Sequence, residues 1–277
     1  MPAVDPRPNF NNKTCLITGA SAGLGRDFAE LFARDGYRCI LVARRRDILN
    51  SIAQSLNTKY LCECIVIDAD LAIPGAGSAL FDKINELGLN VDVLVNNAGA
   101  GTYGMFIDSN ETDQLKMIDL NIRVLTELTR CIAPQMVARG EGRILNVAST
   151  AAFQPGPLMA VYYATKAYVL SFSEALSNEL AGTGVTVTIL CPGPTETEFQ
   201  QLANIDISKL KKSGWLMPSM RAATAGYRGM LRGKRIVIPG FINFIIAESV
   251  RFAPRSFVLR TARWIQEQGR SAAKPAK

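Results

Sequence analysis

The sequence has no histidine among its 277 residues. Histidine is the commonest acid or base at neutral pH, so any proton transfer must use tyrosine, lysine, aspartate or glutamate. A zinc site is not expected either, because the six cysteines include no CxxC pair and no histidine can complete a ligand set. We therefore predict no bound metal.

Other absences narrow the class of protein. No run of about 18 apolar residues is present, so no transmembrane helix is expected. The N-terminal stretch, MPAVDPRPNFNNK, lacks the apolar core of a signal peptide. Most cysteines fall in apolar runs, which together with these absences predicts a cytoplasmic protein. The net charge of +7 permits anionic ligands, but no basic stretch is interleaved with aromatic residues, so no nucleic-acid partner is expected.

Short apolar runs alternate with amphipathic helical stretches such as 24–35 and 160–181. The runs are continuously apolar, which is typical of a parallel sheet covered by helices on both faces. We predict one doubly wound α/β domain over 1–277, with a helical insertion at 198–234 and a C-terminal extension at 241–277. The strands are expected at 13–18, 38–43, 61–67, 92–96, 143–148, 185–190 and 235–238.

The first expected strand runs into the glycine-rich turn TGASAGLG and then a helix. Glycines allow a tight turn and a close approach of the backbone to a pyrophosphate, which the helix N-terminus attracts. The spacing is G-x-x-x-G-x-G, and such a turn can also serve only close packing. The candidate cofactor-binding residues here are Thr18, Gly19, Ser21, Gly23, Leu24 and Gly25.

The second expected strand ends in three arginines and no acid that could bind a ribose 2′-hydroxyl. Arg44 can bind a 2′-phosphate through its forked donors, which favours NADP(H) as the cofactor. Arg45 and Arg46 have no assigned role, and the alternative is that all three form a solvated face. Further candidates follow the next two strands, although the NNAG segment can also be a plain turn. These candidates are Asp70, Leu71, Asn97, Ala98 and Gly99.

Several motifs follow one another in a characteristic order. They are TGASAGLG, NNAG, Asn121, Ser149, Tyr162-x-x-x-Lys166 and Cys191-Pro192-Gly193. In order and spacing this set resembles the short-chain dehydrogenase/reductase family over roughly residues 12–200. The resemblance implies an NAD(P)-dependent oxidoreductase on a seven-stranded Rossmann-type sheet. The C-terminal part is similar to a bacterial branch of the family related to 3-oxoacyl and steroid reductases.

The resemblance also implies four catalytic residues. Tyr162 is the proton donor in ketone reduction and the base in alcohol oxidation. Lys166 lies one helical turn further on the same face, binds the nicotinamide ribose and lowers the pKa of the tyrosine. Ser149 polarises the substrate carbonyl, and Asn121 holds a water for proton relay. Tyr163 is the alternative tyrosine, and only the spacing to the lysine selects between the two.

The family pattern places further residues at the cofactor. Pro192 and Gly193 are expected beside the nicotinamide, and Thr197 at its carboxamide, with Thr195 as the alternative. One position departs from many NADP-using relatives, which carry a basic residue where this chain has Ala22. The predicted preference for NADP(H) therefore depends mainly on the arginine after the second strand.

The predicted substrate-binding segments are rich in apolar residues, which indicates a hydrophobic ketone, aldehyde or secondary alcohol, including lipid-like ones. The residues concerned are Phe153, Pro155, Pro157, Leu158, Met159, Trp215, Leu216 and Met217. A non-catalytic NADP-binding regulator on the same fold is the second hypothesis. A regulator is expected to lose members of the catalytic set, and all four are present, which favours an enzyme.

The C-terminal extension alternates apolar residues with arginines and contains Pro254, which is expected to divide it into two helices. One hypothesis is that it packs over the sheet edge or the substrate pocket, or joins subunits into a homodimer or homotetramer. The other is that residues 241–265 lie on an anionic membrane surface.

Overall fold

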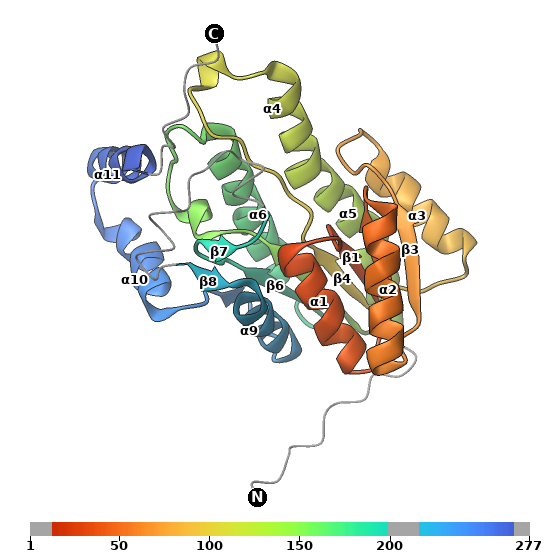
Figure 1. Ribbon diagram of the computed structural model, residues 1–277. Helices are drawn as coiled ribbons and strands as arrows, with labels where there is room; N and C mark the ends of the chain where they lie inside the picture. The colour runs from red at the N-terminus through yellow and green to blue at the C-terminus, as the bar shows by residue number, and fades with distance from the viewer. Residues whose placement is uncertain (1–12, 199–215, 269–277) are drawn as a thin grey trace, which may run out of the picture.

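The computed structural model describes residues 13–198 and 216–268. Figure 1 shows a central sheet with helices on both faces, and the C-terminal helices α10 and α11 beside one end of the sheet. Residues 199–215 of the predicted insertion, including Trp215, lie outside the described residues.

The sheet has seven parallel strands in the order β3-β2-β1-β4-β5-β6-β9, which confirms the predicted fold class. Each strand lies at its predicted place, although β3 begins three residues later than expected and β9 is short. The strands are β1 (Thr14–Thr18), β2 (Arg38–Ala43), β3 (Cys64–Asp68), β4 (Val93–Asn96), β5 (Gly142–Val147), β6 (Val185–Leu190) and β9 (Ile236–Val237).

Helices cover both faces of this sheet because each strand directs apolar side chains to both sides. One buried cluster joins the sheet to α1, α2 and α9, and another joins its opposite face to α3 and α5, with α6 packed alongside. The helices are α1 (Gly23–Arg34), α2 (Arg46–Tyr60), α3 (Ala76–Glu86), α4 (Glu111–Ile118), α5 (Val124–Arg139), α6 (Ala160–Glu179), α9 (Ser219–Leu231), α10 (Phe241–Ser249) and α11 (Arg255–Gln268).

The strand order reverses between β1 and β4, and this reversal positions the site. Chain segments leaving these two strands diverge to opposite faces, which opens a crevice at the carboxyl edge of the sheet. The glycine turn follows β1, the NNAG segment follows β4, Ser149 follows β5, and Pro192 follows β6. Motifs far apart in the sequence therefore meet at one edge.

Two features of the C-terminal part add to the prediction. A small parallel pair, β7 (Thr195–Glu196) and β8 (Met217–Pro218), was not expected, and it fixes the residues after Gly193 to the segment before α9. The predicted break at Pro254 is confirmed, because α10 ends at Ser249 and α11 begins at Arg255.

Candidate active site

The glycine turn after β1 has the shape that a pyrophosphate requires. Gly19 and Gly23 have φ values of +67° and +50°, in the left-handed region that favours glycine. A Cβ on Gly25 would lie 2.1 Å from the carbonyl oxygen of Gly19. No side chain caps the N-terminus of α1, so its first N–H groups are available to an anion. The turn therefore fits a dinucleotide.

The NNAG segment is fixed to this turn by hydrogen bonds, so it is more than a plain turn. The Asn97 side chain donates to the carbonyl oxygens of Thr18 (2.9 Å) and Gly19 (3.3 Å). The Thr18 hydroxyl accepts from the backbone N–H groups of Asn97 and Ala98, each at 3.0 Å. These residues hold the two sides of the crevice at a fixed separation.

The three arginines after β2 have different surroundings. Arg44 is exposed in the bend after the strand and makes no hydrogen bond or ion pair within the described chain. Arg45 donates to the Ser21 hydroxyl at 3.1 Å and pairs with Glu198 at 2.8 Å. Arg46 pairs with Asp68 at 2.9 Å. The structure thus leaves Arg44 available to a phosphate and adds Arg45, which the sequence left unassigned, to the glycine turn.

The predicted adenine-side residues differ in their environment. Leu71 is buried in the core, and Asp70 is exposed. The Asp70 carboxylate accepts from the backbone N–H of Ala72 at 3.1 Å, which fixes the turn after β3. Both residues lie at the carboxyl end of β3, on the side of the crevice that carries Arg44.

The segment after β6 closes the other side of the crevice. The Thr195 hydroxyl is buried and donates to the carbonyl oxygen of Gly193 at 2.8 Å. The Thr197 side chain lies over the glycine turn, since a Cβ on Gly23 would be 2.8 Å from its Cγ2. A Cβ on Gly193 would collide with Asn243 of α10. Both predicted threonines are therefore near the expected path of the cofactor, and Thr197 is the one that faces the pyrophosphate turn.

Ser149, Tyr162 and Lys166 converge at the end of β5. The Ser149 hydroxyl donates to the carbonyl oxygen of Pro192 (3.4 Å), accepts from the N–H of Ala151 (3.1 Å) and is hydrogen-bonded to Tyr162. Lys166 donates to the carbonyl oxygen of Val147 at 2.9 Å, and its Nζ lies over the Tyr162 ring, 5.8 Å from the centroid. The strand end and one face of α6 thus form a single polar cluster.

Burial dominates the acidity of the tyrosine. It raises the pKa of Tyr162 well above its usual value, and the hydrogen bond from Ser149 opposes this only in part. Lys166 lies over the ring and is not among the groups that shift this pKa, so the expected lowering of the tyrosine pKa by the lysine is absent from this structure. The phenol is therefore protonated at neutral pH, which is the form that a proton donor needs.

Asn121 lies in a π-helical turn, Asp119–Arg123, between α4 and α5. Its amide donates to the carbonyl oxygen of Ala100 and the hydroxyl of Thr165, and its oxygen accepts from the N–H of Ala100, all at 2.9 Å. Both amide donors are thus occupied, and the side chain joins the segment after NNAG to α6. Turns of this kind occur frequently at functional sites. Asn121 therefore positions α6, and its role in a water relay stays a prediction.

The two adjacent tyrosines point to different partners. Tyr162 faces Ser149, as described above. The Tyr163 hydroxyl accepts from the side chain of Gln266 on α11, and its ring lies against Gly156. The geometry therefore selects Tyr162 as the residue at the catalytic cluster and gives Tyr163 a role in holding the C-terminal helix.

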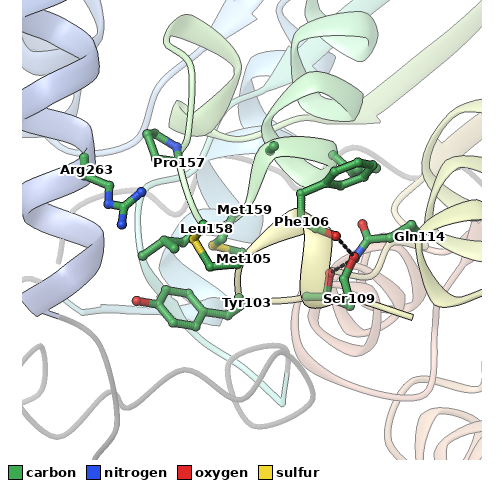
Figure 2. Close-up of a pocket in the computed structure, with 13 residues that line it drawn as sticks. Tyr103, Met105, Phe106, Ser109, Gln114, Pro157, Leu158, Met159 and Arg263 are labelled. Carbon is green, nitrogen blue, oxygen red and sulfur yellow. Dashed lines mark hydrogen bonds between the residues drawn. The ribbon is translucent and has the colours of Figure 1, made fainter. Parts of the chain in front are cut away.

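A cavity of about 200 Å³ is lined on one side by residues 157–161, which come directly before Tyr162 in the sequence. Figure 2 shows how two loops and α11 surround it. The Leu158 backbone has φ +68°, a strained conformation for this residue, and its carbonyl oxygen accepts from the N–H of Gly104 at 2.8 Å. The lining residues are Thr102, Tyr103, Gly104, Met105, Phe106, Ser109, Gln114, Pro157, Leu158, Met159, Ala160, Val161 and Arg263.

The residues that the sequence predicts for substrate binding differ in their relation to this cavity. Pro157, Leu158 and Met159 line it, whereas Phe153, Pro155, Leu216 and Met217 do not. Their role in substrate binding stays a prediction. Phe153 instead packs against the core cluster between β6 and α6, and Met217 lies in β8. The segment 102–109, which follows NNAG, supplies the opposite wall of the cavity.

The second helix of the C-terminal extension covers this cavity. The Tyr103 hydroxyl donates to the backbone oxygen of Gln266 at 2.9 Å, and the Gln266 side chain binds Tyr163. α11 therefore packs against the segment 102–109 and contributes Arg263 to the cavity wall, and a role of the extension at the substrate pocket stays a prediction. In the described part of the chain, no helix has the length and apolar character needed to cross a membrane. Within residues 13–198 and 216–268 no cluster of three or more histidine, cysteine or acidic side chains could hold a metal ion.

Comparison with known proteins decides the family. The profile of the family described as short chain dehydrogenase matches residues 13–207. The chain belongs to the short-chain dehydrogenase family. Its Rossmann-type sheet and the motif order of the sequence agree with this membership.

Individual relatives show how far the similarity extends. The chain is 34% identical over 203 residues to very-long-chain 3-oxoacyl-CoA reductase-B of Danio rerio, covering 71% of this chain and 64% of that protein. It is similar in structure to a short-chain dehydrogenase from Sphingobium yanoikuyae in complex with NADPH, with a TM-score of 0.79, 31% identity and coverage of 96% and 99% of the two chains. A short-chain dehydrogenase from Burkholderia phymatum in complex with NAD has a TM-score of 0.77, 25% identity and coverage of 97% and 99%.

These comparisons establish membership of the short-chain dehydrogenase family. Since the solved relatives include complexes with NADPH and with NAD, they do not decide between the two cofactors. The chain also spans less than two thirds of the length of the zebrafish reductase.

The buried lysine of this short-chain dehydrogenase predicts a pH-dependent affinity for cofactor. Burial lowers the pKa of Lys166 to about 8. Its charge is present below this pH and lost above it, so we expect NADPH binding to weaken as the pH rises from about 7 to about 9. Cys191, the nearby acidic group, does not titrate in this range, because burial raises its pKa to about 12.

Fluorescence titration of NADPH at several pH values measures this effect. Lys166→Met is the matched control, and it should bind weakly with an affinity that no longer changes over the same range. If the dissociation constant of the unmodified protein were flat across this range, the lysine charge would play no part in binding.

Proposed function

We propose that this protein is an NADPH-dependent reductase of hydrophobic ketones or aldehydes, or the corresponding alcohol dehydrogenase. The observation that carries the proposal is the convergence of Ser149, Tyr162 and Lys166 at the end of β5, with the Tyr162 hydroxyl hydrogen-bonded to Ser149. A carbonyl group placed at these two hydroxyls can accept a hydrogen bond from each. A largely apolar cavity lined by residues 157–161, which precede Tyr162 in the sequence, supports a hydrophobic substrate.

The residues of the cluster divide the chemistry between them. The bound nicotinamide supplies a hydride to the carbonyl carbon. The Ser149 hydroxyl donates a hydrogen bond to the carbonyl oxygen, and Tyr162 transfers its proton to that oxygen as the negative charge develops. The products are an alcohol and the oxidised cofactor. The Lys166 ammonium, held by the Val147 carbonyl, binds ribose hydroxyls and aids return of the proton.

The protonated Tyr162 phenol is the form that the reductive direction needs, because it can donate a proton to the carbonyl oxygen. A tyrosine at its ordinary pKa is also protonated at neutral pH, so the shift itself selects no direction. The name of the zebrafish relative, a reductase of 3-oxoacyl thioesters, supports the reductive direction and a lipid-like substrate.

The test is oxidation of NADPH, followed by absorbance, with a panel of hydrophobic ketones, aldehydes and 3-oxoacyl thioesters. Reduction of at least one hydrophobic carbonyl compound is expected. A protein that binds NADPH but turns over none of the panel would support the alternative, a regulator. We favour the enzyme because all four catalytic residues are present and three of them converge.

A preference for NADPH is part of the proposal, supported by the surroundings of Arg44. We expect kcat/KM to be at least about tenfold higher with NADPH than with NADH, which is within the effect of one charge-assisted contact. Arg44→Ala should remove most of this preference. The exposed guanidinium of Arg44 makes no hydrogen bond or ion pair within the described chain, so it is available to a 2′-phosphate, and the substitution removes it.

Arg46→Ala is the matched control, since it removes the same charge from an arginine already paired with Asp68. It should leave the preference unchanged. Equal kcat/KM for the two cofactors in the unmodified protein would refute the preference. Loss of preference in Arg45→Ala but not in Arg44→Ala would instead assign the phosphate to the arginine that contacts Ser21.

We also propose, as the sequence suggested, that copies of this chain associate. The support is the outer face of α10, where the exposed fractions of Phe241, Ile242 and Ile245 are 77%, 58% and 49%. No charged residue interrupts the run FINFIIA in this helix. Sedimentation of the full-length protein is expected to show a dimer or tetramer, and a monomer at all concentrations would contradict this. The structure does not support a peripheral membrane contact of residues 241–265, and a cytoplasmic location stays a prediction from the sequence.

A further inference from the structure

The substrate cavity is uncharged except at one point. Its walls consist of apolar side chains, backbone and neutral polar groups, and Arg263 of α11 is the one charged residue among the residues that line it in the described chain. Figure 2 shows its guanidinium extending from α11 toward Leu158 and the cavity. A cation at the edge of an apolar cavity is a specific recognition element, because it distinguishes anionic from neutral ligands.

The same arginine also borders a second hollow. An open groove of about 370 Å³ is lined by Pro157, Leu259, Arg260, Arg263, Trp264 and Glu267. The groove shares Pro157 and Arg263 with the cavity, so the two hollows adjoin at these residues. Leu259 and Trp264 give the groove apolar sides, and Arg260 adds a second cation that makes no ion pair in the described chain. The combined surface is apolar within and positive at its opening.

One acid lies nearby, and it leaves most of the Arg263 side chain available. Glu267, one turn further along α11, accepts from the Nε of Arg263 at 2.6 Å. The two terminal nitrogens of the guanidinium have no hydrogen-bond partner within the described chain, and these are the donors that bind a carboxylate or phosphate in a fork. The pair with Glu267 orients the guanidinium toward the cavity.

We propose that this site takes an amphipathic carbonyl compound that carries an anionic group, with its hydrocarbon part in the cavity and its carboxylate or phosphate paired with Arg263. The inference rests on the proposed function and names the class of substrate for the same site. Arg263 is then a specificity-determining residue. It distinguishes anionic from neutral substrates and takes no part in proton transfer.

The experiment measures the reduction of 9-oxodecanoate and of its uncharged methyl ester by the full-length protein with NADPH. We expect kcat/KM to be about tenfold higher for the carboxylate, and Arg263→Gln to lower the ratio of carboxylate to ester toward one. Arg255→Gln is the matched control. It removes the same charge from the same helix but lines neither hollow.

A binding measurement separates this inference from the proposed function. Calorimetry with decanoate, decyl phosphate and decan-1-ol is carried out on the unmodified protein, Arg263→Gln and Arg255→Gln. Tighter binding of decanoate or decyl phosphate than of the alcohol, lost only in Arg263→Gln, supports the anion site even if neither ketone is reduced. The stronger of the two ligands indicates whether the substrate anion is a carboxylate or a phosphate.

Two results would overturn the inference. Equal kcat/KM for the acid and the ester, together with an unchanged value in Arg263→Gln, would leave the proposed reductase standing and remove the anion site. Equal affinity for decanoate, decyl phosphate and the alcohol would do the same in the absence of turnover. Thermal unfolding of each variant confirms that the exposed substitutions leave the fold intact.

Discussion

Tyr162→Phe is expected to lower kcat for ketone reduction by about a thousandfold, the middle of the range that a positioned acid contributes. The substitution removes the proton donor and the hydrogen bond with Ser149, but it keeps the buried ring and its contact with Lys166. The chain has no histidine that could replace the lost hydroxyl. NADPH affinity should change little, because the phenylalanine ring fills the same space.

Tyr163→Phe is the matched control, one residue along the same helix. It loses only the hydrogen bond with Gln266, so we expect kcat to stay within a few-fold of the unmodified value. KM should rise, because this bond helps to hold α11 in place. Lys166→Ala should lower kcat and weaken NADPH binding together. Substantial turnover by Tyr162→Phe would falsify the assignment of the proton donor.

Gly25→Ala is expected to weaken NADPH binding by about a hundredfold or more, because the added methyl group has no space at the pyrophosphate turn. Its Cβ would lie 2.1 Å from the carbonyl oxygen of Gly19 and 2.6 Å from the Asn97 side chain. Both contacts are with parts of the turn, so the backbone must move away from the position that binds phosphate. Titration of NADPH measures the loss, and circular dichroism shows whether the sheet is retained.

Gly182→Ala is the control for the general cost of replacing a glycine. Gly182 has φ +83° and nothing within 4 Å of an added Cβ, so this variant carries backbone strain without a collision. We expect a lower melting temperature and unchanged NADPH affinity. If Gly25→Ala bound NADPH as tightly as the unmodified protein, the pyrophosphate would lie elsewhere.

The sequence determined the sheet, the order of its motifs and the choice of chemistry. The strands were predictable because runs such as RCILVA are apolar on both faces, and burial on both faces of a parallel sheet requires that pattern. The spacing of Tyr162 and Lys166 placed both on one face of α6, because helical geometry is local. The absence of histidine left tyrosine, lysine, aspartate and glutamate as proton donors, and the resemblance to the family selected Tyr162 among them.

Only the tertiary structure decided what each side chain contacts. It distinguished Tyr162 from Tyr163, and separated Arg44 from its paired neighbours, because the partners involved lie up to about 150 residues away in the sequence. It placed Arg263 of α11 at a cavity whose other walls follow β4 and β5. It also showed that burial, which depends on every surrounding element, raises the pKa of Tyr162, a shift that the local spacing to the lysine does not predict. Local patterns encode strands, helices and spacing, whereas burial and long-range contacts exist only once the chain has folded.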